Sequence, residues 1–202
     1  FPKSNLVSSA YYALGSIYET EEEFQEAISN FKKVIELDSS DLAGTASIAI
    51  ANIYEKEEKF EEALAMYKDA VQKYSNLSSL VYPKIADIYS KVNNYEQALE
   101  LYRKSLELVP VRQMADIQFK IAQVLQAQGS LDEAIEEYLK VTYLYSEDRG
   151  LVIKSLLRVA VIYEDRENFR EAMNIYKRIV SMDVEEKKYA QERIDWIKTH
   201  TK

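Results

Sequence analysis

The pattern of apolar and polar positions along this chain repeats about every 36 residues. Five stretches carry Glu-Ala or Gln-Ala followed by Ile, Leu or Met, and their alanines serve as anchors: Ala27, Ala63, Ala98, Ala134 and Ala172. The anchors lie 36, 35, 36 and 38 residues apart, and large residues recur around them at three- and four-residue spacing. That spacing is typical of amphipathic helices. A period of this length indicates a tandem array of helical units.

Each unit fills the same columns around its anchor. Twelve positions before it stands a small residue, at Gly15, Ala51, Ala86, Ala122 and Ala160. Four positions after it stands an aromatic residue, at Phe31, Tyr67, Tyr102, Tyr138 and Tyr176. Small residues let two helix axes approach closely, and the large side chains of a neighbour pack over them. The columns therefore predict antiparallel helix pairs, and they account for most of the 16 tyrosines without a tyrosine-rich recognition surface.

Capping and turn residues predict where the helices begin. Asn94, Ser130 and Asn168 each stand three residues before Glu or Gln, which indicates capped starts of second helices. Pro83 falls inside the first of the two helices of the third repeat. There it either lies in the first turn or kinks the helix. The turns expected before first helices are 39–41, 75–76 and 146–148, with Pro110 before the fourth.

The repeated columns resemble the tetratricopeptide repeat (TPR) family. The resemblance implies an all-α fold, a right-handed α-solenoid of helix-turn-helix repeats. Ala190, Ile194 and Ile197 mark one apolar face of a further helix, which is expected to cap the array. The expected segments are a lead-in at 1–7, repeats at 8–43, 44–78, 79–114, 115–152 and 153–184, and a capping helix with tail at 185–202.

Composition narrows the chemistry further. The net charge of −8 disfavours a nucleic-acid partner, and no apolar run is long enough for a membrane span. The chain has no cysteine, and its single histidine, His200, is expected to be a solvated tail residue. Acidic runs such as 21–23 fan out around helix surfaces rather than converge. We therefore expect no catalysis, no metal and no cofactor.

The family resemblance implies that partners dock along a groove lined by the first helices. The groove positions it implies are Tyr12, Ser16, Glu19, Ile48, Asn52, Glu55, Asp87, Phe119, Gln123, Gln126, Leu157 and Glu164. One row of them is apolar and the others are neutral or acidic, unlike the Lys, Asn and Arg with which chaperone-binding relatives clamp a peptide carboxylate. A partner with an apolar segment and basic flanks is expected. The alternative is that the apolar row only packs between neighbouring repeats.

The expected function is a non-enzymatic scaffold that holds a partner protein or peptide. One alternative is a self-assembling subunit, because Phe1, Leu6 and Val7 at the exposed end of the array are suited to packing on another copy or on an upstream repeat. Another is the repeat region of a larger bacterial envelope protein. Junctions such as Tyr74-Ser75 and Tyr145-Ser146 resemble outer-membrane assembly lipoproteins, and the start at Phe1 favours a piece of a longer protein. The compartment stays open between cytoplasm and bacterial periplasm or envelope.

Overall fold

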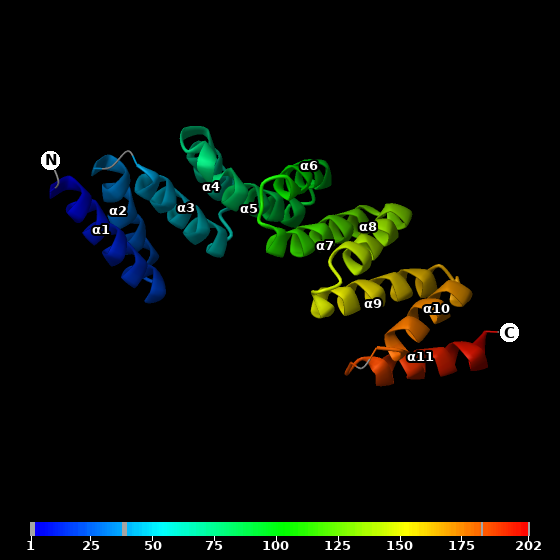
Figure 1. Cartoon of the computed structure of the whole chain (residues 1–202). Coiled ribbons are helices and arrows are strands. Elements are labelled where there is room, and N and C mark those ends of the chain that lie inside the picture. The colour runs from blue at the N-terminus through cyan, green and yellow to red at the C-terminus, as the bar shows by residue number, and fades with distance from the viewer. Residues whose placement is uncertain (1–2, 38–39, 183, 202) are drawn as a thin grey trace. The chain divides into compact units, whose positions relative to one another are not determined.

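The computed structural model describes residues 3–37, 40–182 and 184–201. These residues form helices and no strand, which confirms the predicted all-α fold (Figure 1). The chain divides into two compact units, Phe1–Leu101 and Tyr102–Lys202, which meet within one helix. The helices are α1 (Lys3–Thr20), α2 (Phe24–Leu37), α3 (Asp41–Lys56), α4 (Phe60–Lys73), the short 3-10 helix η1 (Ser75–Leu77), α5 (Ser78–Lys91), α6 (Tyr95–Leu106), α7 (Val111–Gln128), α8 (Leu131–Leu144), α9 (Arg149–Asp165), α10 (Phe169–Val180) and α11 (Lys187–His200).

In the first unit, the small and aromatic columns pack on each other as the pattern predicts. Phe31 of α2 is fully buried and lies against Gly15 of α1. A Cβ added at Gly15 would come within 2.7 Å of the Phe31 ring, so only glycine leaves room for the ring at this distance. Helix α3 packs on α2, and α4 packs on α3 in the same manner. The first unit is therefore a stack in which each first helix packs on the second helix before it.

The second unit repeats this arrangement. Tyr176 of α10 is fully buried beside Ala160 of α9 and the anchor Ala172. Helix α11 packs on α10 and buries its apolar face there, as α3 does on α2. The residues of that face are Ala190, Ile194 and Ile197.

The turn inside each pair contains a residue in the left-handed backbone region, five positions before the anchor. These residues are Glu22, Glu58, Asn93, Gly129 and Glu167, with φ of 61°, 58°, 59°, 90° and 56°. The next amide then bonds back to the carbonyl five residues earlier, as Lys59 N does to Tyr54 O at 2.8 Å. This is the Schellman termination of a helix. Only one of the five positions is glycine, so turn composition alone does not reveal the motif.

Helix starts agree with the expected positions, but the capping bonds agree only partly. Helices α8 and α10 begin directly after Ser130 and Asn168, yet neither side chain makes a capping hydrogen bond. The main-chain bonds of the Schellman turn organise these starts instead. Before α3 and α9 the expected caps form, because Leu42 N donates to Ser40 Oγ at 3.3 Å and Leu151 N donates to Asp148 Oδ1 at 3.0 Å. Helix α5, which follows the turn expected at 75–76, has no side-chain cap.

Pro83 lies beyond the first turn of α5, because that helix already begins at Ser78. Of the two alternatives considered for Pro83, a place in the first turn is therefore wrong. Its missing N–H removes the helical hydrogen bond that the carbonyl of Ser79 would accept.

The left-handed turns give a stability prediction. We expect Glu58→Gly to raise the free energy of unfolding by about 0.5–1 kcal/mol, because glycine adopts positive φ without the Cβ clash. Gly129→Ala should lower it by about 1 kcal/mol for the converse reason. Urea denaturation followed by circular dichroism measures both. Equal stabilities for both variants and the parent chain would contradict the assigned turn geometry.

Candidate partner-binding surfaces

The apolar row of expected groove positions is only partly accessible. Ile48 and Phe119 are 4% and 8% exposed, and the Phe119 ring lies 5.3 Å from that of Tyr138, edge to face. Tyr12 and Leu157 are half-buried. Ile48 and Phe119 are therefore largely buried, and the ring contact of Phe119 lies within its own helix pair, while Tyr12 and Leu157 keep part of their surface accessible.

Four of the expected groove positions, Ser16, Asn52, Asp87 and Gln123, are polar, and Ser16 and Asn52 have local partners. Ser16 Oγ donates to the carbonyl of Tyr12 at 3.1 Å. Asn52 Oδ1 accepts a hydrogen bond of 2.5 Å from the hydroxyl of Tyr67. Asp87 is half-buried, whereas Gln123 is exposed. Of these four, Gln123 offers the most accessible polar group.

The three glutamates among the expected groove positions, Glu19, Glu55 and Glu164, bind cations of the chain itself. Glu19 pairs with Lys56 at 2.7 Å, Glu55 pairs with Lys91 at 2.6 Å, and Glu164 pairs with Arg193 at 2.7 Å. Lys56 and Lys91 come from α3 and α5, the first helices of the next pairs, and Arg193 comes from α11. Each ion pair therefore joins the first helix of one repeat to the first helix that begins after that repeat. We call these three pairs the inter-repeat clamps.

In the first unit, each clamp lysine also lies near an aromatic ring. Lys56 Nζ lies 5.9 Å from the centre of the Phe24 ring, and Lys91 Nζ lies 5.7 Å from that of Phe60. At these distances a cation is attracted by the face of the ring. Glu55 also accepts a hydrogen bond from Tyr67 at 3.3 Å. Burial, and next the Glu55 charge, raise the pKa of Tyr67. The clamp carboxylates thus already have partners within the chain, so they are less available to bind a cationic group of a ligand.

A sequence signal for the first-unit clamps exists but needs two repeats to be compared. A glutamate eight positions before one anchor is followed by a lysine seven positions before the next. Where the glutamate is replaced, at Ser90 and Gln126, the later position holds Ala127 and Asp165 instead of a lysine. Glutamate and lysine are thus present or absent together, as a structural pair requires.

One polar pocket in the first unit gathers several expected site residues. It has a volume of about 460 Å³ and is lined by Glu19, Asn52, Glu55, Lys56, Lys84 and Lys91. Its two glutamates are the clamp residues already paired with two of its lysines. Lys84 remains without an ion pair among the described residues. The pocket therefore carries a small positive excess rather than the expected acidic character.

A second pocket combines apolar and cationic side chains. We call it the second-unit pocket; its volume is about 540 Å³ and its lining is Phe119, Gln123, Lys154, Leu157, Arg158, Val161 and Tyr189. It brings together three of the expected groove residues from α7 and α9, with Tyr189 from α11. Lys154 and Arg158 are exposed and form no ion pair with any residue that the structure describes.

Arg158, at the edge of this pocket, lies near the buried Tyr138 of the core. Tyr138 is fully buried, and its hydroxyl donates a hydrogen bond to Gln126 Oε1 at 2.8 Å. Burial raises the pKa of Tyr138 to about 12, and the nearby positive charge of Arg158 opposes that rise. Since no carboxylate lines the pocket, the two cations favour an anionic group there.

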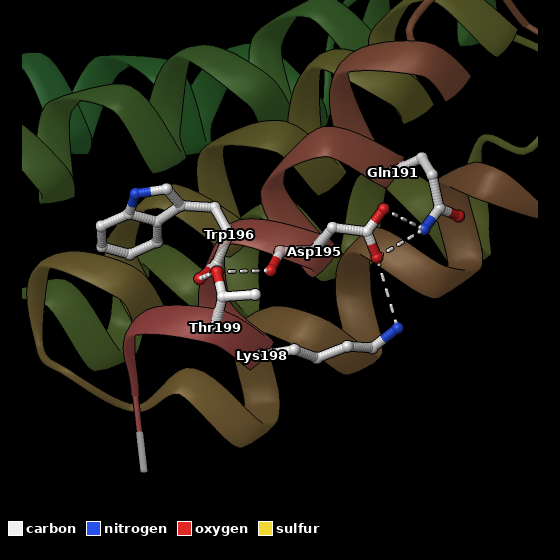
Figure 2. Close-up of polar contacts among 5 residues, drawn as sticks. All are labelled: Gln191, Asp195, Trp196, Lys198 and Thr199. Atoms are coloured by element: carbon white, nitrogen blue, oxygen red, sulfur yellow. Dashed lines mark hydrogen bonds and ion pairs between the residues drawn. The ribbon is translucent and has the colours of Figure 1, made fainter.

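Helix α11 presents different chemistry on its flanks. Figure 2 shows the Asp195 carboxylate and the Trp196 indole directed to different sides of the helix. Asp195 accepts hydrogen bonds of 3.1 Å from Gln191 and pairs with Lys198 at 3.4 Å. The Gln191 hydrogen bond, and next Lys198, lower the pKa of Asp195. His200 is exposed and stacks on Trp196 with ring centres 4.8 Å apart.

Neither a candidate metal site nor a helix suited to cross a membrane occurs in the part of the chain that the structure describes. No group of three or more His, Asp or Glu residues there is placed to hold a metal ion. No described helix combines the length and the apolar character that crossing a bilayer requires.

The fold and these surfaces define the chain as an α-helical repeat protein whose units are helical hairpins. Family models described as tetratricopeptide repeat match residues 8–41, 41–110 and 113–183. The chain belongs to the tetratricopeptide repeat family.

Solved structures with the same fold cover most of the chain. The crystal structure of MamA protein is 19% identical, with 97% of this chain and 96% of that chain covered and a TM-score of 0.70. The crystal structure of YrrB, described as a TPR protein with an unusual peptide-binding site, is 23% identical, covers 86% of this chain and 84% of that chain, and has a TM-score of 0.66. A tetratricopeptide repeat protein from Parabacteroides merdae is 14% identical, covers 98% and 81%, and has a TM-score of 0.73. A search of curated proteins gives no match.

Proposed function

We propose that this protein is a non-enzymatic interaction scaffold whose second-unit pocket docks a segment of a partner protein. The segment carries an apolar side chain next to a carboxylate. The observation that supports this most is the pairing of an apolar floor with two cations that lack internal partners. Phe119 and Leu157 supply the floor, while Lys154 and Arg158 stand at its edge.

Physical chemistry favours this occupant for two reasons. Lys154 and Arg158 are four residues apart on α9, so their side chains project from one face of the helix. A carboxylate between them would make charge-assisted hydrogen bonds, which are stronger than those between neutral groups. Leu157 and Val161 are half-buried, and an apolar side chain that covers them would remove their remaining surface from water. This burial would contribute favourably to the binding free energy.

The pocket modifies the partner expected from the groove rows alone. The apolar part of that expectation is kept. The expected basic flanks suit this pocket poorly, because they would face Lys154 and Arg158 and find no acid in its lining. YrrB, which is described as having an unusual peptide-binding site, gives a precedent for peptide docking on this fold.

Selection from a random peptide library on the whole chain tests the proposal. We expect enriched peptides to share an Asp or Glu adjacent to a large apolar residue. The double variant Lys154→Glu/Arg158→Glu should weaken their binding by about tenfold or more, because it replaces attraction with repulsion. Affinities are measured by fluorescence anisotropy at two salt concentrations, and higher salt should weaken binding to the parent chain.

The matched control is Arg170→Glu/Lys177→Glu, which makes the same charge change at two exposed positions of α10 outside the pocket. It should leave the affinity within about twofold of the parent value. Equal weakening by both double variants would mean that net charge, not this pocket, governs binding. Enriched peptides that lack acidic residues would overturn the proposed ligand chemistry.

A further inference from the structure

Helix α1 carries an apolar stripe that nothing in the described structure covers. Leu6, Val7, Leu14 and Ile17 are 74%, 45%, 43% and 54% exposed. Ala10 and Ala13 lie between them and are also exposed. No charged residue occurs anywhere from 4 to 18. Contiguous exposed apolar surface of this kind marks an interaction site more often than a free surface. We call these six residues the α1 stripe.

The corresponding positions of other first helices are buried. Ala46, Ile50 and Ile53 of α3 stand 36 residues after Ala10, Leu14 and Ile17, and all three are fully buried. They pack on α2, against the residues Ala27, Ile28, Phe31 and Val34. In the second unit, α11 buries Ala190, Ile194 and Ile197 on α10. The α1 stripe therefore has the composition of a surface that receives another helix.

We infer that a second copy of this chain covers the stripe, with α1 packed antiparallel against the partner's α1 about a two-fold axis. The stripe is self-complementary in this orientation. Its small residues, Ala10 and Ala13, lie in the middle and allow close helix approach, while Leu6 at one end meets Ile17 of the partner subunit at the other.

The charges at the ends of α1 favour the antiparallel orientation. Glu21, Glu22 and Glu23 follow α1 directly and are exposed. In an antiparallel pair they lie near the N-terminus of the partner helix, where unpaired N–H groups carry partial positive charge. A parallel pair would bring the two acidic ends together. This inference does not depend on the second-unit pocket, because all its residues belong to the first unit.

Sedimentation equilibrium of the whole chain tests the association. We expect a monomer–dimer equilibrium in the micromolar range, since one helix pair buries less than a standard interface. Leu14→Glu/Ile17→Glu should weaken it about tenfold or more, by placing two charges in the contact. Both positions are exposed, so helical content should not change. Tyr143→Glu/Leu144→Glu, at exposed apolar positions of α8, is the matched control and should leave the dimer intact.

Cysteine cross-linking distinguishes the orientation, since the chain has no cysteine of its own. In the antiparallel pair, Leu6→Cys on one copy faces Ile17→Cys on the other. Each variant alone would place its two cysteines roughly 16 Å apart along the helix axis, too far for a disulfide. We therefore expect mild oxidation to link the mixed variants and not Ile17→Cys alone.

Several results would overturn the inference. A chain that stays monomeric up to about 100 μM has an open stripe or one reserved for another protein. A dimer that survives Leu14→Glu/Ile17→Glu uses another surface. Linking of Ile17→Cys to itself would mean a parallel pair, and assemblies larger than a dimer would mean head-to-tail contacts.

Discussion

Tyr67→Ala should lower the free energy of unfolding by about 3–5 kcal/mol, the largest single-residue loss we expect. The ring is fully buried in the first unit, packed with Ala51, Ala63 and Ile85. Removing it leaves a cavity that the surrounding helices fill only in part, and it deletes the hydroxyl that reaches Asn52. Urea denaturation followed by circular dichroism measures the loss.

Two further variants separate the contributions of ring and hydroxyl. Tyr67→Phe keeps the ring and should cost only about 1 kcal/mol, the typical net value of a hydrogen bond. Tyr143→Ala removes a tyrosine that is 67% exposed, and it should change stability by no more than about 0.5 kcal/mol. A loss for Tyr67→Ala no larger than that for Tyr143→Ala would show that the aromatic column does not hold the first unit together.

The repeat columns could be predicted from the sequence because their contacts are local. A small residue and the aromatic residue that covers it lie about 16 positions apart, as Gly15 and Phe31 do, inside one helix pair. The same pair occurs five times, so chance matches are averaged out. Helix order followed from the same periodicity. The buried face of α11, which lies outside the repeats, followed from the spacing of its own apolar residues.

The candidate binding surfaces were less predictable, because they depend on side chains from different repeats. The groove rows included Glu19 and Glu55 as ligand-binding residues, but the structure pairs both with lysines more than 30 positions away. Conversely, Lys154 and Arg158 lie outside those rows and reach the pocket from a neighbouring face of α9. A row carried over from the family fixes a position on a helix, but it does not determine which neighbouring side chains fill the pocket.

The division into two units also had no signal in the sequence. It falls within α6, between Leu101 and Tyr102, where the anchor spacing is as regular as elsewhere. Spacing reports how each hairpin is built, since the same columns are needed in every repeat. It carries little information on how firmly one repeat is held to the next, which depends on contacts such as the clamps.

Raising the pH above about 10 should destabilise the protein through its buried tyrosines. Burial raises the pKa of Tyr67, Tyr138 and Tyr176, that of Tyr138 to about 12. The unfolded chain releases these protons near pH 10, whereas the folded chain retains them, so the unfolded form binds fewer protons and gains stability as pH rises. At about pH 11 each such tyrosine should cost about 1.4 kcal/mol, and the three together about 4 kcal/mol, relative to about pH 9.

Tyr138→Phe separates this effect from the loss of lysine charge in the same pH range. The variant keeps every lysine but has no proton to lose at this position, so its stability should fall by about 1.4 kcal/mol less between about pH 9 and pH 11. The cost of losing the hydrogen bond to Gln126 is present at both pH values and cancels in the difference. Urea denaturation at the two pH values measures it. Parallel declines for variant and parent chain would mean that Tyr138 ionises equally easily in the folded and unfolded states, which its complete burial beside the Phe119 ring argues against.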